Sequence, residues 1–246
     1  MEFNYILPIG YKTADGKTHR EVVIKELTGF DEEWAFNAAK TQQPLVALIG
    51  LLERLVVSIG EIKPVTQEVI KSLLVGDLNY LVTVVRCVSL GKDLEFSIQC
   101  PNCKKQGKFV QDLEQLERIT LEDDADRLFE VKLEKGVADS KGDLQKDVVM
   151  KFLTVEDQVA ISTYINNPAK AINIMLVKSI VKLGNIPSIK EDTVKGMVQK
   201  DRAKLLQAID QKTPGVNLVV DATCEDCGST YKVPLGIENF FGFKAI

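Results

Sequence analysis

Apolar and polar positions alternate with a strand-like period at the start of the chain. One strand is expected over Phe3–Ile9 and a second over His19–Leu27, joined by a turn at Ala14–Lys17 that contains Asp-Gly. Thr28 then offers an N-cap for a helix with acidic residues in its first turn. The pattern therefore predicts a β-hairpin that leads directly into a helix.

Helical spacing dominates the next segment. An apolar stretch predicts a helix over about Leu45–Ser58, which Gly60 and Pro64 end. A short helix follows, and a longer one opens at Asp77. Its apolar stripe consists of Leu78, Leu81, Val82, Val85 and Val88. A strand over Leu94–Gln99 then enters a turn that carries two cysteines, and a second strand leaves it.

The second half of the chain repeats this order. Phe3–Gly10 aligns with Phe129–Gly136, and Val22–Thr28 aligns with Val148–Thr154, both at an offset of 126 residues. Further on the offset becomes 124. The matched pairs there include Leu52 with Leu176, Gly60 with Gly184, Asp77 with Asp201, Leu81 with Leu205, and Cys100 and Cys103 with Cys224 and Cys227. A register held over so many positions predicts an internal duplication.

The repeat sets the expected organisation. The first half covers residues 1–112, a linker covers 113–127, and the second half covers 128–246. An acidic run at Glu122, Asp123, Asp124 and Asp126 falls in the linker. In the second half, a helix is expected over Ala171–Leu183 and a strand over Val216–Ala222. Each half is then a β-hairpin, helices and a cysteine-bearing β-hairpin, which is an α+β fold.

The paired cysteines carry the clearest chemical signal. Cys100 and Cys103 enclose Pro-Asn, and Cys224 and Cys227 enclose Glu-Asp, with Gly228 relieving the second turn. Two such knuckles supply four thiolates, which is the ligand set of a tetrahedral structural Zn²⁺ site. If the halves pack about a pseudo-two-fold axis, one zinc ion clamps them together and couples its binding to folding.

Other uses of these cysteines predict different surroundings. A thioredoxin-like redox motif places Cys-x-x-Cys at a helix start, whereas each pair here is expected between two strands. Five cysteines are too few for a disulfide scaffold in a chain of this length. Unmetallated, vestigial cysteines remain an alternative. The fifth, Cys87, falls on the apolar stripe of its helix and is interpreted as a small buried core residue.

Composition narrows the function classes. The net charge is −4 and the pI is about 5.3, which argues against a broadly basic nucleic-acid surface. No signal peptide is expected, and the longest apolar run, Leu45–Leu52, is too short to span a bilayer. The single histidine, His19, has no evident nucleophile or acid beside it and is interpreted as an exposed strand residue. No catalytic site and no small-molecule substrate are therefore expected.

Two local features leave alternatives open. Three lysines follow the first cysteine pair, namely Lys104, Lys105 and Lys108, whereas the second pair is acidic. They either neutralise the thiolates and nearby carboxylates or contact nucleic acid. The C-terminal segment 238–246 contains Phe240, Phe241 and Phe243. We expect these rings to cover the protein's own core, the alternative being an anchor in a partner's groove.

The order of these features resembles a known family. It resembles the baseplate hub subunit of T-even-type contractile-tailed bacteriophages. The resemblance is carried by the segment Thr28–Glu33, the tripeptide Ser89-Leu90-Gly91, and the strand that runs from Gly91-Lys92-Asp93-Leu94 into Cys100-Pro101-Asn102-Cys103. The likeness covers most of the first half and, through the duplication, much of the second. It implies a role in hub assembly, as a structural part or an assembly factor.

Two functional hypotheses follow. The first is a non-catalytic structural or assembly component of a contractile-tail baseplate hub, stabilised by zinc. Its expected partners are other hub proteins, without membrane or nucleic acid, and its expected location is the host cytoplasm during assembly or the virion. The alternative is a zinc-ribbon accessory module that binds nucleic acid, and a redox enzyme comes third.

Overall fold

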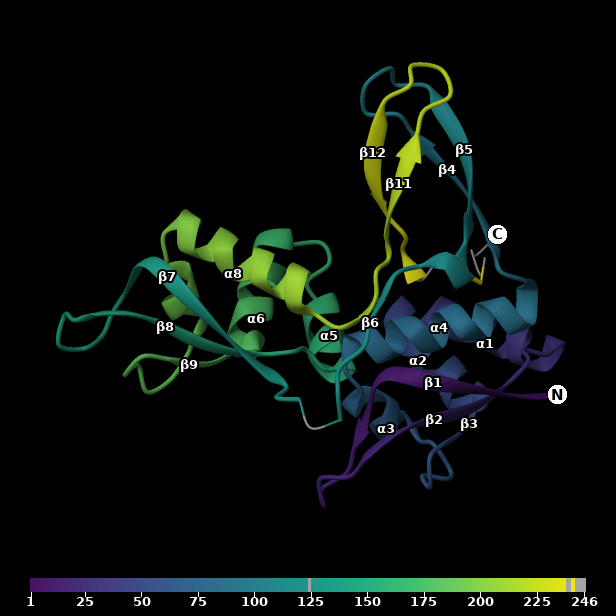
Figure 1. The fold of residues 1–246 in the computed structure, drawn as a ribbon, viewed down its shortest axis with the longest axis horizontal. Coiled ribbons are helices and arrows are strands. Elements are labelled where there is room, and N and C mark those ends of the chain that lie inside the picture. Colours follow the sequence, from purple (N-terminus) through teal and green to yellow (C-terminus); the bar gives the residue numbers. More distant parts are fainter. Residues whose placement is uncertain (124, 238–239, 242–246) are drawn as a thin grey trace. The chain divides into compact units, whose positions relative to one another are not determined.

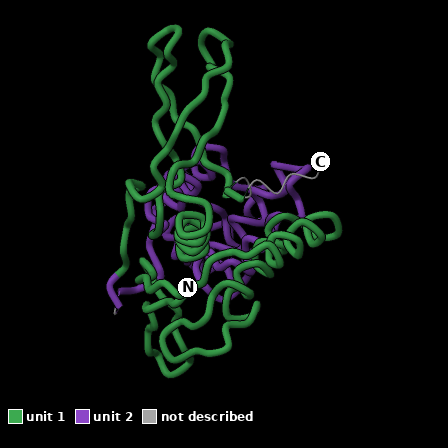
Figure 2. Tube along the Cα trace, turned by 90° about the vertical axis from the view of Figure 1, so that its right-hand side faces the viewer, with its two compact units in different colours: residues 1–70, 76–121, 214–246 green, residues 71–75, 122–213 purple. Residues whose placement is uncertain are grey.

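The computed structural model describes residues 1–123, 125–237 and 240–241. The chain forms two compact units, shown in Figure 2. Unit 1 comprises residues 1–70, 76–121 and 214–246, and unit 2 comprises residues 71–75 and 122–213. This division differs from the predicted halves, because the C-terminal hairpin groups with the N-terminal unit. Asp124 of the acidic run and residues 238–239 and 242–246, including Phe243, lie outside the described residues.

Unit 1 contains a three-stranded sheet, several two-stranded sheets and most of the helical residues of the first half (Figure 1). Its helices are α1 (Gly29–Thr41), α2 (Pro44–Leu55), most of α3 (Gln67–Ser72), α4 (Val75–Leu90) and the 3₁₀ turn η1 (Leu113–Gln115). Its strands are β1 (Glu2–Lys12), β2 (Thr18–Lys25), β3 (Val56–Ile59), β4 (Asp93–Gln99), β5 (Gln106–Asp112), β6 (Arg118–Ile119), β10 (Gly215–Val216), β11 (Val219–Thr223) and β12 (Thr230–Pro234).

The N-terminal sheet has the order β1-β2-β3, with both pairings antiparallel. The predicted helix over Leu45–Ser58 is wrong at its end: α2 stops at Leu55 and the chain continues as β3. Val56 and Val57 extend the apolar run, but their branched side chains favour a strand, and β3 pairs with β2. Leu52, Leu55 and Ile59 are fully buried in this core.

A buried carboxylate fixes a bulge in this sheet. The β1–β2 register shifts between Ile6 and Tyr11, and Gly10 sits in the bulge with a φ of 89°. Asp77, in the first turn of α4 and fully buried, accepts the backbone N–H groups of Ile9 and Gly10, both at 2.9 Å. The aspartate thus does more than open its helix: it satisfies two amides that the bulge removes from the ladder.

Unit 2 repeats the first part of this arrangement. Its elements are β7 (Leu128–Ala138), β8 (Leu144–Lys151), β9 (Ile180–Leu183), α5 (Val155–Ser162), α6 (Pro168–Ser179), α7 (Glu191–Lys195) and α8 (Gln199–Lys212). The sheet order is β7-β8-β9. As in unit 1, the predicted helix over Ala171–Leu183 ends early and its last residues form a strand, β9. The predicted strand Val216–Ala222 is likewise split into β10 and β11.

Asp201 holds the bulge of the second sheet. It lies in the first turn of α8 with no exposed surface, and it accepts the backbone N–H groups of Glu134, Lys135 and Gly136. Desolvation alone would raise the pKa of Asp201, but these hydrogen bonds outweigh it and hold the pKa below its usual range. The carboxylate is therefore charged and fully used inside the fold.

Both predicted helix starts are confirmed. The carboxylate of Asp31 accepts from the backbone N–H of Thr28 at 3.1 Å, which closes a capping box at the start of α1. At the start of α5, Asp157 N–H donates to the Thr154 hydroxyl at 3.2 Å. The two sheets, two bulge aspartates and two capping boxes support the predicted duplication, which remains a prediction.

His19 is buried, with 7% of its surface exposed, so its assignment as an exposed strand residue is wrong. Its imidazole packs against Gly60, where an added Cβ would lie 2.5 Å from Nδ1.

Phe240 and Phe241 are both buried, in agreement with the expectation that these rings cover the protein's own core.

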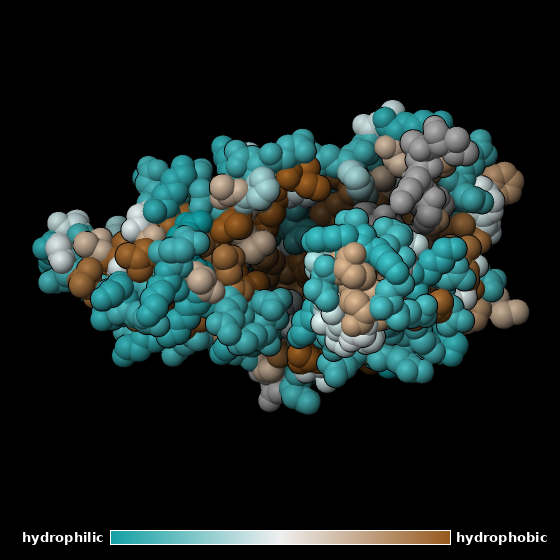
Figure 3. All heavy atoms as spheres, turned by 90° about the horizontal axis from the view of Figure 1, so that it is seen from above, coloured by the Kyte–Doolittle hydropathy of each residue, from teal (hydrophilic) through white to brown (hydrophobic). Residues whose placement is uncertain are grey.

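The surface is mostly hydrophilic on the face shown in Figure 3. In the part of the chain that the structure describes, none of the helices is long and apolar enough to cross a membrane.

Candidate metal centre

Two antiparallel hairpins of unit 1 carry the cysteine pairs. The β4–β5 hairpin turns at Cys100–Cys103, and the β11–β12 hairpin turns at Cys224–Cys227. Figure 1 shows the hairpins side by side, with their turns at the same end. Polar residues alternate with apolar ones along the strands, so each hairpin presents one apolar face.

Aromatic contacts join the hairpins below the turns. Phe96 and Phe109 stack within the first hairpin, with ring centroids 5.6 Å apart. Phe109 also meets Tyr231 of the second hairpin edge to face at 6.4 Å. Gly107 leaves room for the Phe109 ring, since an added Cβ would lie 2.8 Å from it. These rings give the paired hairpins a small core of their own.

The two turns share one backbone design. In the first, Cys100 N–H donates to the Lys105 carbonyl and Lys104 N–H donates to the Cys100 carbonyl. In the second, Cys224 and Gly228 make the equivalent bonds, to Ser229 and Cys224. Lys104 has a φ of 63° and Gly228 a φ of 69°. The predicted role of Gly228 in relieving its turn is confirmed, whereas the first turn places a lysine in the same left-handed conformation.

These turns bring the four sulfur atoms together. The Sγ atoms of Cys100 and Cys227 are 3.7 Å apart, as are those of Cys103 and Cys224, and all four lie within 4.8 Å of one another. These distances are far too long for disulfides, whose S–S bond is about 2.05 Å. A regular tetrahedron with Zn–S bonds of about 2.3 Å has S···S edges of about 3.8 Å. The donor set and its spacing therefore fit a tetrahedral, all-thiolate metal ion.

Polar contacts hold the turns in register with each other. Lys105 Nζ lies 2.6 Å from Asp226 Oδ1, so one of the three lysines pairs with the acidic second turn, as the sequence suggested. Asn102 donates from Nδ2 to the Ser229 hydroxyl at 2.9 Å. Cys100 and Cys224 are buried, whereas Cys103 is half-buried and Cys227 is exposed. One side of the cluster therefore faces solvent, from which an ion can enter.

The cluster ionises unevenly without a cation. Hydrogen bonds with the side chain and the backbone N–H of Ser229 lower the pKa of Cys227 to about 6. At Cys103 the Lys105 backbone N–H favours the thiolate, but desolvation and the neighbouring cysteines outweigh it and raise the pKa to about 11. The Cys227 thiolate thus forms near neutral pH, and its negative charge disfavours ionisation of the neighbouring cysteines. A bound divalent cation would remove this repulsion and displace the remaining protons.

Replacing Gly228 by alanine should cost about 1 kcal/mol of stability, because a Cβ is strained at this positive φ although it meets no atom within 4 Å. Chemical denaturation of the metal-loaded protein measures the loss. Gly29→Ala is the matched control, since Gly29 has equal space and no positive φ. Equal stability of the two variants would contradict the assigned strain.

The fifth cysteine does not join this cluster. Cys87 is half-buried and lines a cavity beside α4, so its interpretation as a small buried core residue is wrong. Burial still raises the pKa of its thiol to about 11, which keeps it protonated. All four clustered cysteines could be identified from the sequence. The cavity could not, because the residues that line it come from five separate elements.

A family model described as T4 bacteriophage base plate protein matches residues 20–242, which is most of the chain. No curated protein and no solved structure matches the chain.

Proposed function

The chain belongs to the T4 bacteriophage base plate protein family, and on this premise we propose that it is a non-catalytic structural or assembly component of the hub of a contractile-tail baseplate. The family match over residues 20–242 is the observation that carries the proposal. The protein would act in the host cytoplasm while the tail is assembled, and its partners would be other hub proteins.

A structural zinc ion is the second part of the proposal. Cys100, Cys103, Cys224 and Cys227 would hold Zn²⁺ through four thiolates. Zinc would then join a hairpin from the middle of the chain to one near its C-terminus, and so tie the C-terminal hairpin to the rest of unit 1. Four protein ligands leave no open position for water or substrate, which is the mark of a structural rather than a catalytic zinc site.

A nucleic-acid-binding zinc ribbon is supported less well. Its motivation is the lysine-rich first turn, but Lys105 is engaged with Asp226, and the second turn adds Glu225. Charge is thus balanced across the paired turns, and the chain as a whole is acidic. Salt-dependent binding of DNA or RNA that is lost when Lys104, Lys105 and Lys108 become glutamate would favour the ribbon.

Reconstitution tests the assembly role. The zinc-loaded chain is mixed in turn with each purified hub protein of the same phage, and complexes are detected by size-exclusion chromatography with light scattering. We expect a stable complex with at least one hub protein. If none of the hub proteins binds, the proposal fails.

A further inference from the structure

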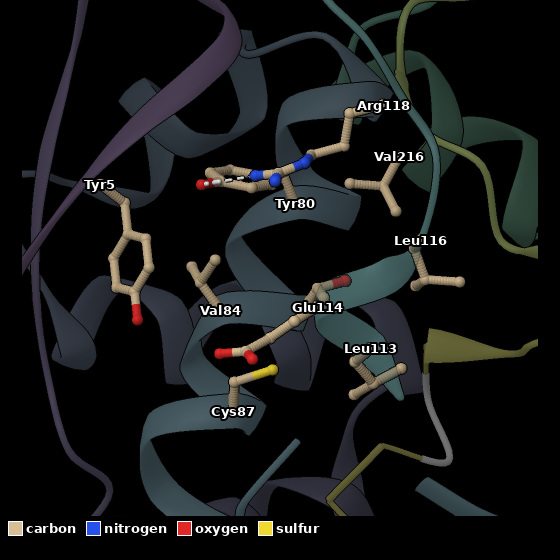
Figure 4. Close-up of a pocket in the computed structure, with 10 residues that line it drawn as sticks. Tyr5, Tyr80, Val84, Cys87, Leu113, Glu114, Leu116, Arg118 and Val216 are labelled. Atoms are coloured by element: carbon tan, nitrogen blue, oxygen red, sulfur yellow. Dashed lines mark hydrogen bonds between the residues drawn. The ribbon is translucent and has the colours of Figure 1, made fainter. Parts of the chain in front are cut away.

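A cavity in unit 1 lies between β1, α4, the η1 turn, β6 and β10 (Figure 4). Its volume is about 190 Å³. Sites for small-molecule ligands usually measure about 300–1,000 Å³, so this cavity is too small for a typical cofactor or substrate. It is large enough for one long side chain. The lining explains which kind of side chain would fit.

Most of the wall is apolar and buried. Val84 of α4, Leu113 and Leu116 around η1, and Val216 of β10 each expose less than a tenth of their surface. Tyr80 is also buried, and its ring packs edge to face against Tyr5, with centroids 6.4 Å apart. Such a wall favours an aliphatic stem over a polar chain.

One end of the cavity is acidic and polar. The Glu114 carboxylate, the Tyr5 hydroxyl and the Cys87 thiol gather there (Figure 4). The Cys87 thiol stays protonated, so the carboxylate supplies the only negative charge among these three groups.

Among the described residues, the Glu114 carboxylate forms a long ion pair with Lys92, and it shares this partner with Asp112. Lys92 Nζ lies 3.9 Å from Glu114, beyond hydrogen-bond distance, and donates its hydrogen bond to Asp112 at 2.8 Å. The Glu114 side chain is 65% exposed, so its carboxylate can be reached from outside and can accept hydrogen bonds from a second cation.

The opposite end carries a fixed cation. The Arg118 guanidinium lies over the Tyr80 ring, with Cζ 5.6 Å from the ring centroid and Nη1 3.5 Å from the hydroxyl. An occupant with a positive tip would be repelled from this end and attracted to Glu114. Its direction in the cavity is thus set by charge.

We propose that this cavity receives a single arginine or lysine side chain of another baseplate protein, with the aliphatic stem along Val84, Leu113 and Leu116 and the cationic tip at Glu114. The inference rests on the proposed function for the identity of the partner. The carboxylate and the Tyr5 hydroxyl accept hydrogen bonds from the tip, and the apolar wall excludes water around the stem. Arg118 rejects the reverse orientation.

The test uses the hub protein that binds in the reconstitution described above. Glu114→Gln should weaken that complex about tenfold, because a charge-assisted hydrogen bond within an interface is lost. Glu117→Gln is the matched control: Glu117 is exposed, lies three residues away and does not line the cavity, so its loss should change the affinity less than about twofold. Equal affinities for Glu114→Gln and the unmodified chain would overturn the proposal.

A second arm separates this inference from the assembly role. The unmodified chain is titrated with N-acetyl-arginine amide and with the neutral N-acetyl-norleucine amide, and the tyrosine resonances of Tyr5 and Tyr80 are followed by NMR. We expect saturable shifts with the arginine compound only, and their loss in Glu114→Gln. Equal responses to the two compounds, or no response to either, would overturn the cavity's assignment even if a hub complex forms. Specific shifts without any hub complex would instead contradict the proposed function alone.

Discussion

Replacing Cys224 by serine is expected to release the metal ion and to destabilise unit 1 by more than about 3 kcal/mol, because structural zinc contributes about 10–16 kcal/mol to the folding of small zinc domains. For a chain of this size the loss corresponds to a fall in Tm of about 6–12 °C or more. Metal content after dialysis against a chelator and the thermal midpoint measure the two effects. The β11–β12 hairpin should become the first part of unit 1 to exchange its amide hydrogens.

The chain supplies a matched control for this variant. Cys87→Ser makes the same chemical change at a half-buried cysteine outside the cluster, and it should leave metal content unchanged. If Cys224→Ser retained a full complement of zinc and the stability of Cys87→Ser, the four cysteines would not form the metal site.

Replacing Asp201 by alanine should lower the free energy of unfolding by about 3 kcal/mol, because hydrogen bonds to a charged acceptor contribute about 1.5–3 kcal/mol each and the change leaves buried N–H groups without an acceptor. The affected groups are the amides of Glu134, Lys135 and Gly136. Asp192→Ala is the control, since Asp192 occupies the first turn of α7 with its side chain exposed. It should change stability by less than about 0.5 kcal/mol.

The effect of Asp201 should also depend on pH. Its folded pKa is lowered, so its contribution is fully present above the unfolded pKa of about 3.9 and is lost as the pH falls through the lower folded value. The stability difference between the unmodified chain and Asp201→Ala should therefore be constant from about pH 5 to 7 and shrink below about pH 4. Urea denaturation across this range measures it. A difference that grew in acid would show that the carboxylate does not stabilise the bulge as a charged acceptor.

Local patterns in the sequence were sufficient to predict the features that depend on few residues. The β1–β2 hairpin follows from alternation and an Asp-Gly turn, and the β7–β8 hairpin follows from the alignment of the second half with the first. The helix starts at Thr28 and Thr154 follow from capping chemistry. The cysteine cluster could be predicted because a tetrahedral ion requires four ligands, and the repeat supplied the second pair.

Features set by distant contacts could not be predicted in the same way. Val56 and Ile180 continue apolar runs that read as helix, and only pairing with β2 and β8 makes them strands. Asp77 and Asp201 were recognised as helix-opening residues, but nothing local indicates that their carboxylates reach bulges 67 and 65 positions earlier in the chain. The grouping of the C-terminal hairpin with unit 1 depends on contacts across more than a hundred residues.

The resemblance and the family match support the same general assignment by different routes. The cysteine turn and its preceding strand suggested a phage baseplate protein, and the family model places residues 20–242 in the T4 base plate protein family.

The most direct test of the central claim is the metal content of the purified chain, measured by native mass spectrometry on protein prepared without added metal. The account predicts one zinc ion per chain, lost together with the compact fold of the paired hairpins in Cys224→Ser. A metal-free chain with four reactive thiols at Cys100, Cys103, Cys224 and Cys227 and an unchanged fold would contradict it.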